Sequence, residues 1–268
     1  MKERNSRQSF LGENSEQILE YIKVAVVGLG GGGSHIVQQL AHLGVMNFVL
    51  FDGDTFEESN INRLIGSQAG DIKNKTSKTE IARRLVTSIN PDVKVTLIPN
   101  DWHEGHMELR ECDFIFTCVD SYGERNQLER FSRRFLLPMI DIGMDVYKSE
   151  SGYFISGQVV RTLPNEPCMW CLNVLNEENV STEAQKYGAA GGKPQVVWSN
   201  GLLASAAVGL FVELVTPWNS IEHGTICLEY DGNKNSLTKS NLMSLPKVSQ
   251  KICDHYSPLD VGDSFFLN

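Results

Sequence analysis

The feature that most constrains this chain is a short hydrophobic run that ends in a cluster of glycines. Residues 24–34 read Val-Ala-Val-Val-Gly-Leu-Gly-Gly-Gly-Gly-Ser. Gly28, Gly30 and Gly33 have the G-x-G-x-x-G spacing, and an amphipathic pattern follows from His35 to Leu43. A buried strand that turns sharply into a helix has this pattern, and the N–H groups at the helix start can bind a phosphate. A tight turn alone would need only one or two glycines, so the pattern favours nucleotide binding.

A second hydrophobic run, Phe48–Phe51, leads directly into Asp52. Asp52 stands roughly twenty residues after the glycines, where nucleotide-binding folds place an acid that accepts ribose hydroxyls. A nicotinamide-dependent oxidoreductase would show the same strand, glycine turn and acid. These features alone therefore leave two classes of nucleotide enzyme open.

Composition narrows the class of protein further. The chain has 268 residues, 41% hydrophobic content and a formal net charge of −9, which argue for a globular protein without a basic nucleic-acid surface. The N-terminus lacks the apolar stretch of a secretory signal, and the longest apolar run, Leu202–Val215, is short and contains Glu213. We expect a soluble cytoplasmic protein whose six cysteines are thiols or metal ligands rather than disulfides.

Strand-like and helix-like segments alternate along the first half of the chain. Strands are predicted at residues 23–28, 47–51, 93–97, 113–118 and 138–142, and helices at 15–21, 34–43, 78–89, 122–135 and, later, 200–215. This alternation predicts an α/β fold with a doubly wound, mostly parallel, Rossmann-like sheet. From Gly152 the pattern changes to longer strands, a polar loop at about 176–195 and a hairpin-like end, which predicts a C-terminal mixed-strand extension.

Several polar residues follow the predicted strands, where open α/β sheets bind their ligands. They are Asp52, Asp54, Asn60, Arg63, Lys78 and Asp120. With MgATP as the ligand, Asp52 would accept the ribose hydroxyls, Arg63 and Lys78 would neutralise the β- and γ-phosphates, and Asp120 would hold magnesium. Taken singly, Lys78 is better explained as a solvated lysine at a helix start and Asp120 as a helix N-cap. The whole set together with the glycine turn favours the ATP site.

In this order the motifs resemble the ThiF/MoeB/HesA-type adenylyltransferases, the short bacterial form of the ubiquitin-activating-enzyme-like superfamily. The resemblance covers nearly the whole chain and includes Ile89-Asn90-Pro91 and Arg125-Asn126. Its matching site positions are Arg7, Gly28, Gly30, Gly31, Gly33, Asp52, Asp54, Asn60, Arg63, Lys78 and Asp120.

The resemblance implies one adenylation domain over residues 1–268. Residues 1–22 would be an N-terminal arm, 23–150 the nucleotide-binding half and 151–268 the carrier-binding half. In this family the C-terminal glycine of a small ubiquitin-like or sulfur-carrier protein attacks the α-phosphate of ATP, and pyrophosphate leaves. The resemblance also implies a homodimer in which Arg7 reaches the neighbouring subunit's ATP, and a crossover loop at 176–195 that covers the carrier's tail.

The cysteines match the family in part. Cys168 and Cys171 match its first zinc pair, whereas its second C-x-x-C is replaced by Cys253-Asp254-His255, so Cys253 and His255 are expected to complete a zinc site. The other reading is that Cys168 and Cys171 are buried thiols at a helix start. No cysteine stands between Cys171 and Cys227, so the crossover loop has no nucleophile, and a conjugating enzyme or sulfur donor would receive the activated carrier directly.

Three other functions fit parts of the sequence. An oxidoreductase gives no reason for Arg63, Lys78 and Asp120 to gather. The superfamily's branch that modifies tRNA is disfavoured by the acidic charge and the C-x-x-C pair. A non-catalytic subunit of a heterodimeric activating enzyme would lack the phosphate-binding residues that this chain has. The sequence does not identify the carrier or its pathway.

Overall fold

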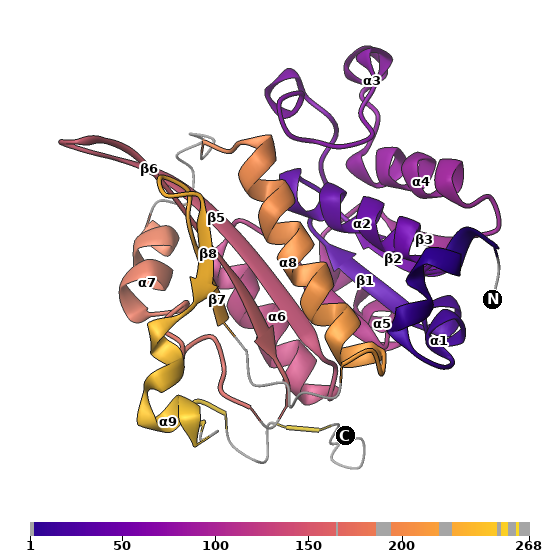
Figure 1. The fold of residues 1–268 in the computed structure, drawn as a ribbon. Helices are drawn as coiled ribbons and strands as arrows, with labels where there is room; N and C mark the ends of the chain where they lie inside the picture. The colour runs from indigo at the N-terminus through magenta and orange to yellow at the C-terminus, as the bar shows by residue number, and fades with distance from the viewer. Residues whose placement is uncertain are drawn as a thin grey trace.

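The computed structural model describes residues 3–164, 166–185, 194–219, 227–250, 253–256 and 261–262, and in it one sheet runs through both halves of the chain (Figure 1). Its strands are β1 (Lys23–Val27), β2 (Asn47–Phe51), β3 (Lys94–Ile98), β4 (Phe114–Thr117), β5 (Met139–Ser149), β6 (Gly152–Thr162), β7 (Cys227–Asp231) and β8 (Ser236–Lys239). The order across the sheet is β3-β2-β1-β4-β5-β6-β7-β8. The strands from β3 to β5 pair in parallel, and those from β5 to β8 pair antiparallel. The prediction of a doubly wound, mostly parallel sheet with a mixed C-terminal extension is confirmed.

Helices cover both faces of the sheet, as parallel strands joined by crossovers require (Figure 1). In chain order they are α1 (Ser15–Tyr21), α2 (Gly31–Leu43), α3 (Ala69–Asn74), α4 (Lys78–Ile89), α5 (His106–Arg110), α6 (Tyr122–Arg134), α7 (Glu177–Gln185), α8 (Val197–Val215) and α9 (Pro246–Ser249). Short 3-10 helices lie at Glu3–Leu11, Glu58–Asn60, Trp102–Gly105 and Asn241–Ser244. One apolar core lies between the sheet and α2, α4 and α8, and a second lies between the sheet and α5 and α6.

The helix α8 is longer than predicted, since it begins at Val197 rather than at Asn200. By length and composition it is the one helix of the described residues that could span a membrane. It packs on α2, β5 and β6, and Leu203, Ala207 and Phe211 are fully buried in the core. This burial accounts for its apolar composition.

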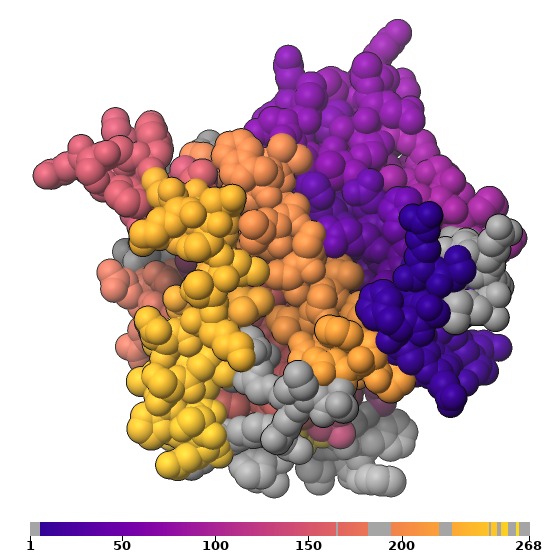
Figure 2. Space-filling model, in the orientation of Figure 1, coloured from indigo at the N-terminus to yellow at the C-terminus, as the bar shows by residue number. Residues whose placement is uncertain are grey.

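The N-terminal arm is more ordered than a polar extension would be. It forms the 3-10 helix Glu3–Leu11, and the Phe10 ring contacts the Trp218 ring at a centroid distance of 6.3 Å. Figure 2 shows this arm lying against the C-terminal end of α8. The arm therefore lies at the end of the sheet where β1 begins, away from the glycine turn that follows β1.

The glycine turn begins its helix earlier than predicted. The helix α2 starts at Gly31, whereas the sequence predicts a start at Ser34. Two glycines explain why the backbone adopts this path. Gly28 has φ of +87°, and a Cβ on Gly33 would lie 1.9 Å from the Gly28 carbonyl oxygen. The first turn of the helix thus packs directly on the end of β1, a contact that no larger residue permits.

We expect Gly33→Ala to destabilise the protein by at least about 3 kcal/mol, because the added carbon forces two buried backbone segments apart. Gly30→Ala is the matched control, since no atom lies within 4 Å of a Cβ at Gly30. Thermal and urea denaturation of both variants measure the difference. Equal stability of the two variants would contradict the close approach at Gly33.

Candidate active site

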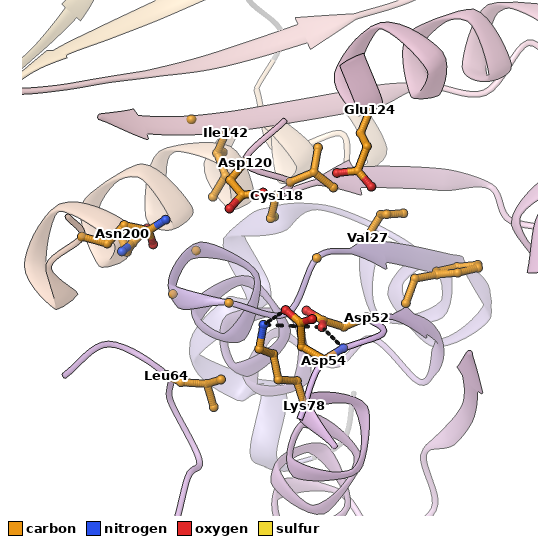
Figure 3. A pocket seen from close by; sticks show the side chains of 18 of the residues that line it. Val27, Asp52, Asp54, Leu64, Lys78, Cys118, Asp120, Glu124, Ile142 and Asn200 are labelled. Carbon is orange, nitrogen blue, oxygen red and sulfur yellow. Dashed lines mark hydrogen bonds and ion pairs between the residues drawn. The ribbon is translucent and has the colours of Figure 1, made fainter. Parts of the chain in front are cut away.

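A cavity of about 460 Å³ lies at the carboxyl ends of β1, β2 and β4. The chain reverses its winding direction between β1 and β4, and open α/β sheets bind ligands at this switch point. Figure 3 shows Asp52, Asp54 and Lys78 on one side of the cavity, and Asp120, Ile142 and Asn200 on the other. The predicted residues that line it are Gly28, Gly30, Gly31, Asp52, Asp54, Asn60, Arg63, Lys78 and Asp120. Gly33 does not line the cavity but packs in the first turn of α2 against the Gly28 carbonyl. Arg7 does not line the cavity either.

The start of α2 faces the cavity through Gly30, Gly31 and Gly32. The first N–H groups of a helix have no carbonyl partner within the helix. Because these residues are glycines, a ligand can approach the backbone closely, and the helix dipole favours a negative charge there. The start of α2 therefore has the geometry that suits an anion, and the binding of a phosphate there stays a prediction.

Asp52 has a structural task that the sequence does not reveal. Its carboxylate accepts the Leu29 N–H at 2.7 Å and the Asp54 N–H at 2.9 Å, so it fixes the glycine turn against the end of β2. Burial raises the pKa of Asp52, against the lowering effect of the Lys78 ammonium. Whether it also accepts ribose hydroxyls stays a prediction.

Lys78 is held inside the cavity. Its Nζ lies 2.6 Å from Asp54 Oδ2 and 3.5 Å from Asp52 Oδ1, and its side chain is 11% exposed. Burial alone would lower the pKa of Lys78, but the two carboxylates outweigh burial and raise it. The alternative of a solvated lysine at a helix start is therefore wrong.

The loop that carries Asn60 and Arg63 is fastened to α2 and α4. The Ser34 hydroxyl accepts the Ile65 N–H at 3.0 Å, and Arg84 donates to the Gly66 carbonyl and to Asp71. The hydrogen bonds from Arg84 lower the pKa of Asp71 to about 2. The segment forms a loop with two short helices, Glu58–Asn60 and Ala69–Asn74, and the ion pair explains why so polar a segment has a fixed position.

Asp120 follows β4 and is not the N-cap of α6. Ser121 caps α6 by accepting the Glu124 N–H at 3.2 Å. The segment that carries Asp120 is bound to β5 through Arg125, whose Nη2 donates to the carbonyls of Val119 and Ile142 at 2.6 and 3.2 Å. A buried arginine thus fixes the backbone next to the carboxylate that faces the cavity.

Sequence reasoning missed part of the lining. Asn100, Asp101 and Trp102 follow β3, and the rule that found Asp120 could have found them. Gln195 and Asn200 come from the second half of the chain, where no local pattern marks them. Residues 186–193 of the predicted crossover loop, with Gly188, Gly191 and Gly192, lie outside the described residues. The loop's first part is the helix α7.

The predicted zinc ligands come together although 81 or more residues separate the two pairs. The ligand atoms of Cys168, Cys171, Cys253 and His255 lie within 4.8 Å of one another. Cys168 Sγ lies 3.6 Å from Cys171 Sγ, and both sulfurs lie 3.4 Å from His255 Nδ1. Four ligands about 2.0–2.3 Å from a zinc ion are roughly 3.3–3.8 Å apart in a tetrahedron, so these residues fit that metal.

Two buried side chains of α6 hydrogen-bond to the segment that carries Cys168 and Cys171. Glu129 is fully buried and accepts the Met169 N–H, while Arg133 donates to Glu129 and to the carbonyls of Pro164 and Glu166. Burial raises the pKa of Glu129 to about 7. The turn that presents Cys168 and Cys171 is therefore held by a network on α6.

Cys112 and Cys227 lie in the core, as predicted, whereas Cys118 also lines the cavity. Cys112 and Cys227 are buried, and burial raises the pKa of the first to about 12 and that of the second to about 11. Burial also raises the pKa of Cys118, which lies between the glycine turn and the end of β4. Thiols with raised pKa values are poor nucleophiles at neutral pH.

The sequence profile of the ThiF family matches residues 3–252. The chain belongs to the ThiF family. The resemblance inferred from the sequence is therefore confirmed.

Relatives with established names share about a third of the aligned residues. The chain is 31% identical over 179 residues to the ubiquitin-like modifier-activating enzyme 5 of Dictyostelium discoideum, and the match covers 60% of this chain and 44% of that protein. It is 31% identical over 173 residues to the molybdopterin-synthase adenylyltransferase of Escherichia coli, and this match covers 63% of this chain and 66% of that protein. It is 32% identical over 152 residues to the SAMP-activating enzyme E1 of Haloferax volcanii, and this match covers 56% of this chain and 53% of that protein. The chain thus spans from under half to about two thirds of these relatives' lengths.

Solved structures support the fold. The E. coli protein MccB with succinimide matches with a TM-score of 0.72 at 20% identity, over 90% of this chain and 72% of that one. The protein PaaA matches with a TM-score of 0.70 at 19% identity, over 90% of this chain and 82% of that one. At these identities the likeness speaks for the fold alone.

Proposed function

We propose that this chain is an adenylyltransferase that activates the C-terminal glycine of a small ubiquitin-like or sulfur-carrier protein. The observation that carries the proposal is the cavity, which joins the glycine start of α2 to Lys78, Arg63 and Asp120. The relatives' names include a molybdopterin-synthase adenylyltransferase and two activating enzymes for ubiquitin-like proteins or SAMP. We treat residues 1–268 as one adenylation domain of a cytoplasmic enzyme.

In the proposed reaction the carrier's carboxylate oxygen forms a bond to the α-phosphorus of ATP. The bond from the α-phosphorus to the bridging oxygen breaks, and pyrophosphate leaves with its electron pair. Negative charge grows on the leaving group, so Lys78 and Arg63, with Asn60 as a neutral donor, stabilise the transition state. The start of α2 binds the phosphates, and Asp52 is placed to orient the ribose as well as the glycine turn.

Asp120 would hold magnesium, because a carboxylate is a ligand that this ion prefers. Bound magnesium neutralises phosphate charge in such sites. Arg125 keeps the Asp120 backbone in place through the Val119 carbonyl.

Neither rival function accounts for the cavity as well. Hydride transfer to a nicotinamide does not require cations at a triphosphate, and the net charge of −9 does not suit an RNA substrate. With no cysteine between Cys171 and Cys227, the acyl-adenylate would pass to a separate conjugating enzyme or sulfur donor.

We also propose that Arg7 completes the site of a second subunit in a homodimer. Arg7 is exposed, and its arm is anchored at the far end of α8 rather than over its own cavity. A residue in this position serves a phosphate site only across a subunit boundary.

The cysteine–histidine cluster would bind one structural zinc ion. Cys168, Cys171, Cys253 and His255 supply four ligands, which leaves no open position for a catalytic water. A zinc ion held there would join the C-terminal segment to the turn supported by α6.

Asp120→Asn should reduce carrier-dependent ATP–pyrophosphate exchange by at least about a hundredfold, because the variant loses a magnesium ligand in the transition state. The assay uses a panel of purified small proteins that end in Gly-Gly, with [32P]pyrophosphate. Asp92→Asn, at an exposed position after α4, is the control and should retain full exchange. Exchange with no member of the panel would refute the proposed function, and full exchange by Asp120→Asn would refute the role of Asp120.

Mixing two inactive variants tests whether Arg7 acts on the site of the other subunit. Arg7→Ala lacks the arm residue and Asp120→Ala lacks the magnesium ligand, so a mixed dimer regains one site with both groups. We expect exchange to recover to about a quarter of the wild-type rate after random subunit exchange, since half the dimers are mixed and each has one intact site. No recovery, once native mass spectrometry shows mixed dimers, would contradict action across the dimer.

Purified protein should contain about one zinc ion per chain, as a closed four-ligand site does. Cys253→Ser should lose the metal, and Cys112→Ser should retain it, because the Cys112 thiol donates to the Glu108 carbonyl and is not one of the four clustered ligands. Elemental analysis and thermal denaturation with and without a chelator measure both effects. If metal-free protein were as stable as the protein as purified, the zinc site would be contradicted and the three cysteines would be ordinary thiols.

A further inference from the structure

Asp141 is a buried acidic residue that the proposed reaction does not use. It lies on β5, and its side chain is 0% exposed. The Thr117 hydroxyl donates to Asp141 Oδ1 at 2.7 Å, whereas Oδ2 has no hydrogen-bond partner among the described residues. A carboxylate that is removed from water without a full set of hydrogen bonds lowers the stability of a fold. An apolar residue of similar size would suit this place better, so the carboxylate points to a task other than stability.

The pairing of the sheet places Asp141 beside the turn that leads to Asp120. Thr117 is the last residue of β4, and it pairs with Asp141 in the neighbouring strand. Side chains alternate along a strand, so Asp141 lies on the same face of β5 as Met139 and Gly143. Met139 belongs to the apolar core between the sheet and α6. Asp141 is therefore covered by α6, close to the start of that helix.

Arg125 of α6 is the side chain that lies against Asp141. Its Nε is 3.6 Å from Asp141 Oδ1, and its side chain is only 7% exposed. A Cβ on Gly143 would lie 2.5 Å from Arg125 Nη1 and 2.4 Å from Gln158 Nε2. The guanidinium thus occupies space that only a glycine at position 143 leaves open. Its place between α6 and β5 is fixed by the fold.

From this place the guanidinium holds the turn after β4. Nε and Nη2 of Arg125 donate to the Val119 carbonyl at 3.2 and 2.6 Å. Val119 directly precedes Asp120, whose carboxylate faces the cavity (Figure 3). A guanidinium is planar and rigid, so an anion next to Nε also sets the direction of the neighbouring donors. The position of Asp141 therefore bears on the position of Asp120.

We propose that Asp141 is a positioning residue, which directs the Arg125 guanidinium to the Val119 carbonyl and thereby holds Asp120 in place to bind magnesium. This inference rests on the proposed function, since it names what positions the proposed magnesium ligand. Neither Asp141 nor Thr117 lines the cavity, so both act through Arg125 rather than on a ligand.

Metal binding tests the proposal without catalysis. The probe is Mn²⁺, and its binding is measured by electron paramagnetic resonance in the presence of α,β-methylene-ATP. Asp141→Asn keeps the shape of the side chain and removes its charge, so we expect Mn²⁺ to bind about tenfold more weakly, the effect of one contact to a charged group. Thr117→Val removes the hydrogen bond to Asp141 alone and should weaken binding about threefold. Because Thr117 acts through Asp141, the double variant should bind Mn²⁺ as Asp141→Asn does.

Thr162→Val is the matched control for Thr117→Val. Thr162 is buried on β6, and its hydroxyl has no hydrogen-bond partner within the described part of the chain. The same substitution there removes no such contact, and Mn²⁺ should bind as it does to the wild type. Thermal denaturation of each variant measures the structural effect separately. If Thr117→Val lowered the thermal stability and left the Mn²⁺ affinity unchanged, Asp141 would only support the fold and the proposal would be overturned. That comparison decides the question even if Asp141→Asn does not fold.

Pyrophosphate exchange by the wild type with the Gly-Gly panel separates this proposal from the proposed function. Mn²⁺ binding that depends on Asp141 and Thr117, in a protein that shows no exchange, would support the positioning role and refute adenylation. Exchange by a protein whose Mn²⁺ affinity is unaffected by both substitutions would overturn the positioning role and leave adenylation standing. Unaffected Mn²⁺ affinity together with no exchange would overturn both.

Discussion

The close approach of the backbone at Gly28 and Gly33 is the contact on which the rest of the site depends. It brings the start of α2 onto the end of β1 and leaves Gly30 facing the cavity. Asp52 then fixes the turn by accepting the Leu29 N–H, and the same carboxylate lies beside the Lys78 ammonium. The start of α2 and the Lys78 ammonium are thus positioned by one compact set of contacts.

The sequence predicted the strands and the polar residues of the first half well. Strands β1, β2 and β4 are continuous apolar runs, and such runs are typical of parallel strands buried on both faces. Asp120 and Lys78 could be predicted because chain position after a strand fixes their place at the sheet edge. The start of α2 at Gly31 could not be predicted from the sequence, because glycine has a low helix propensity and this first turn is stabilised by close packing on β1.

Features that depend on long-range contacts could not be predicted from the sequence alone. Asn200 reaches the cavity only because α8 packs along α2. The strand β5 was predicted to end at Ile142, yet it continues to Ser149, because residues 144–149, none of which is fully buried, pair with β6. The cysteine–histidine cluster needed a resemblance to be suspected, and the fold then brought its two halves together.

The helix α8 joins the two ends of the molecule. Asn200 at its start lines the cavity, and Trp218, just after its end, contacts Phe10 of the arm. At about 1.5 Å per residue its 19 residues span about 28 Å. From Phe10 back to Arg7 a 3-10 helix advances only about 6 Å, at roughly 2 Å per residue. The helix therefore acts as a spacer of fixed length, and it holds the arm too far from its own cavity for Arg7 to reach it.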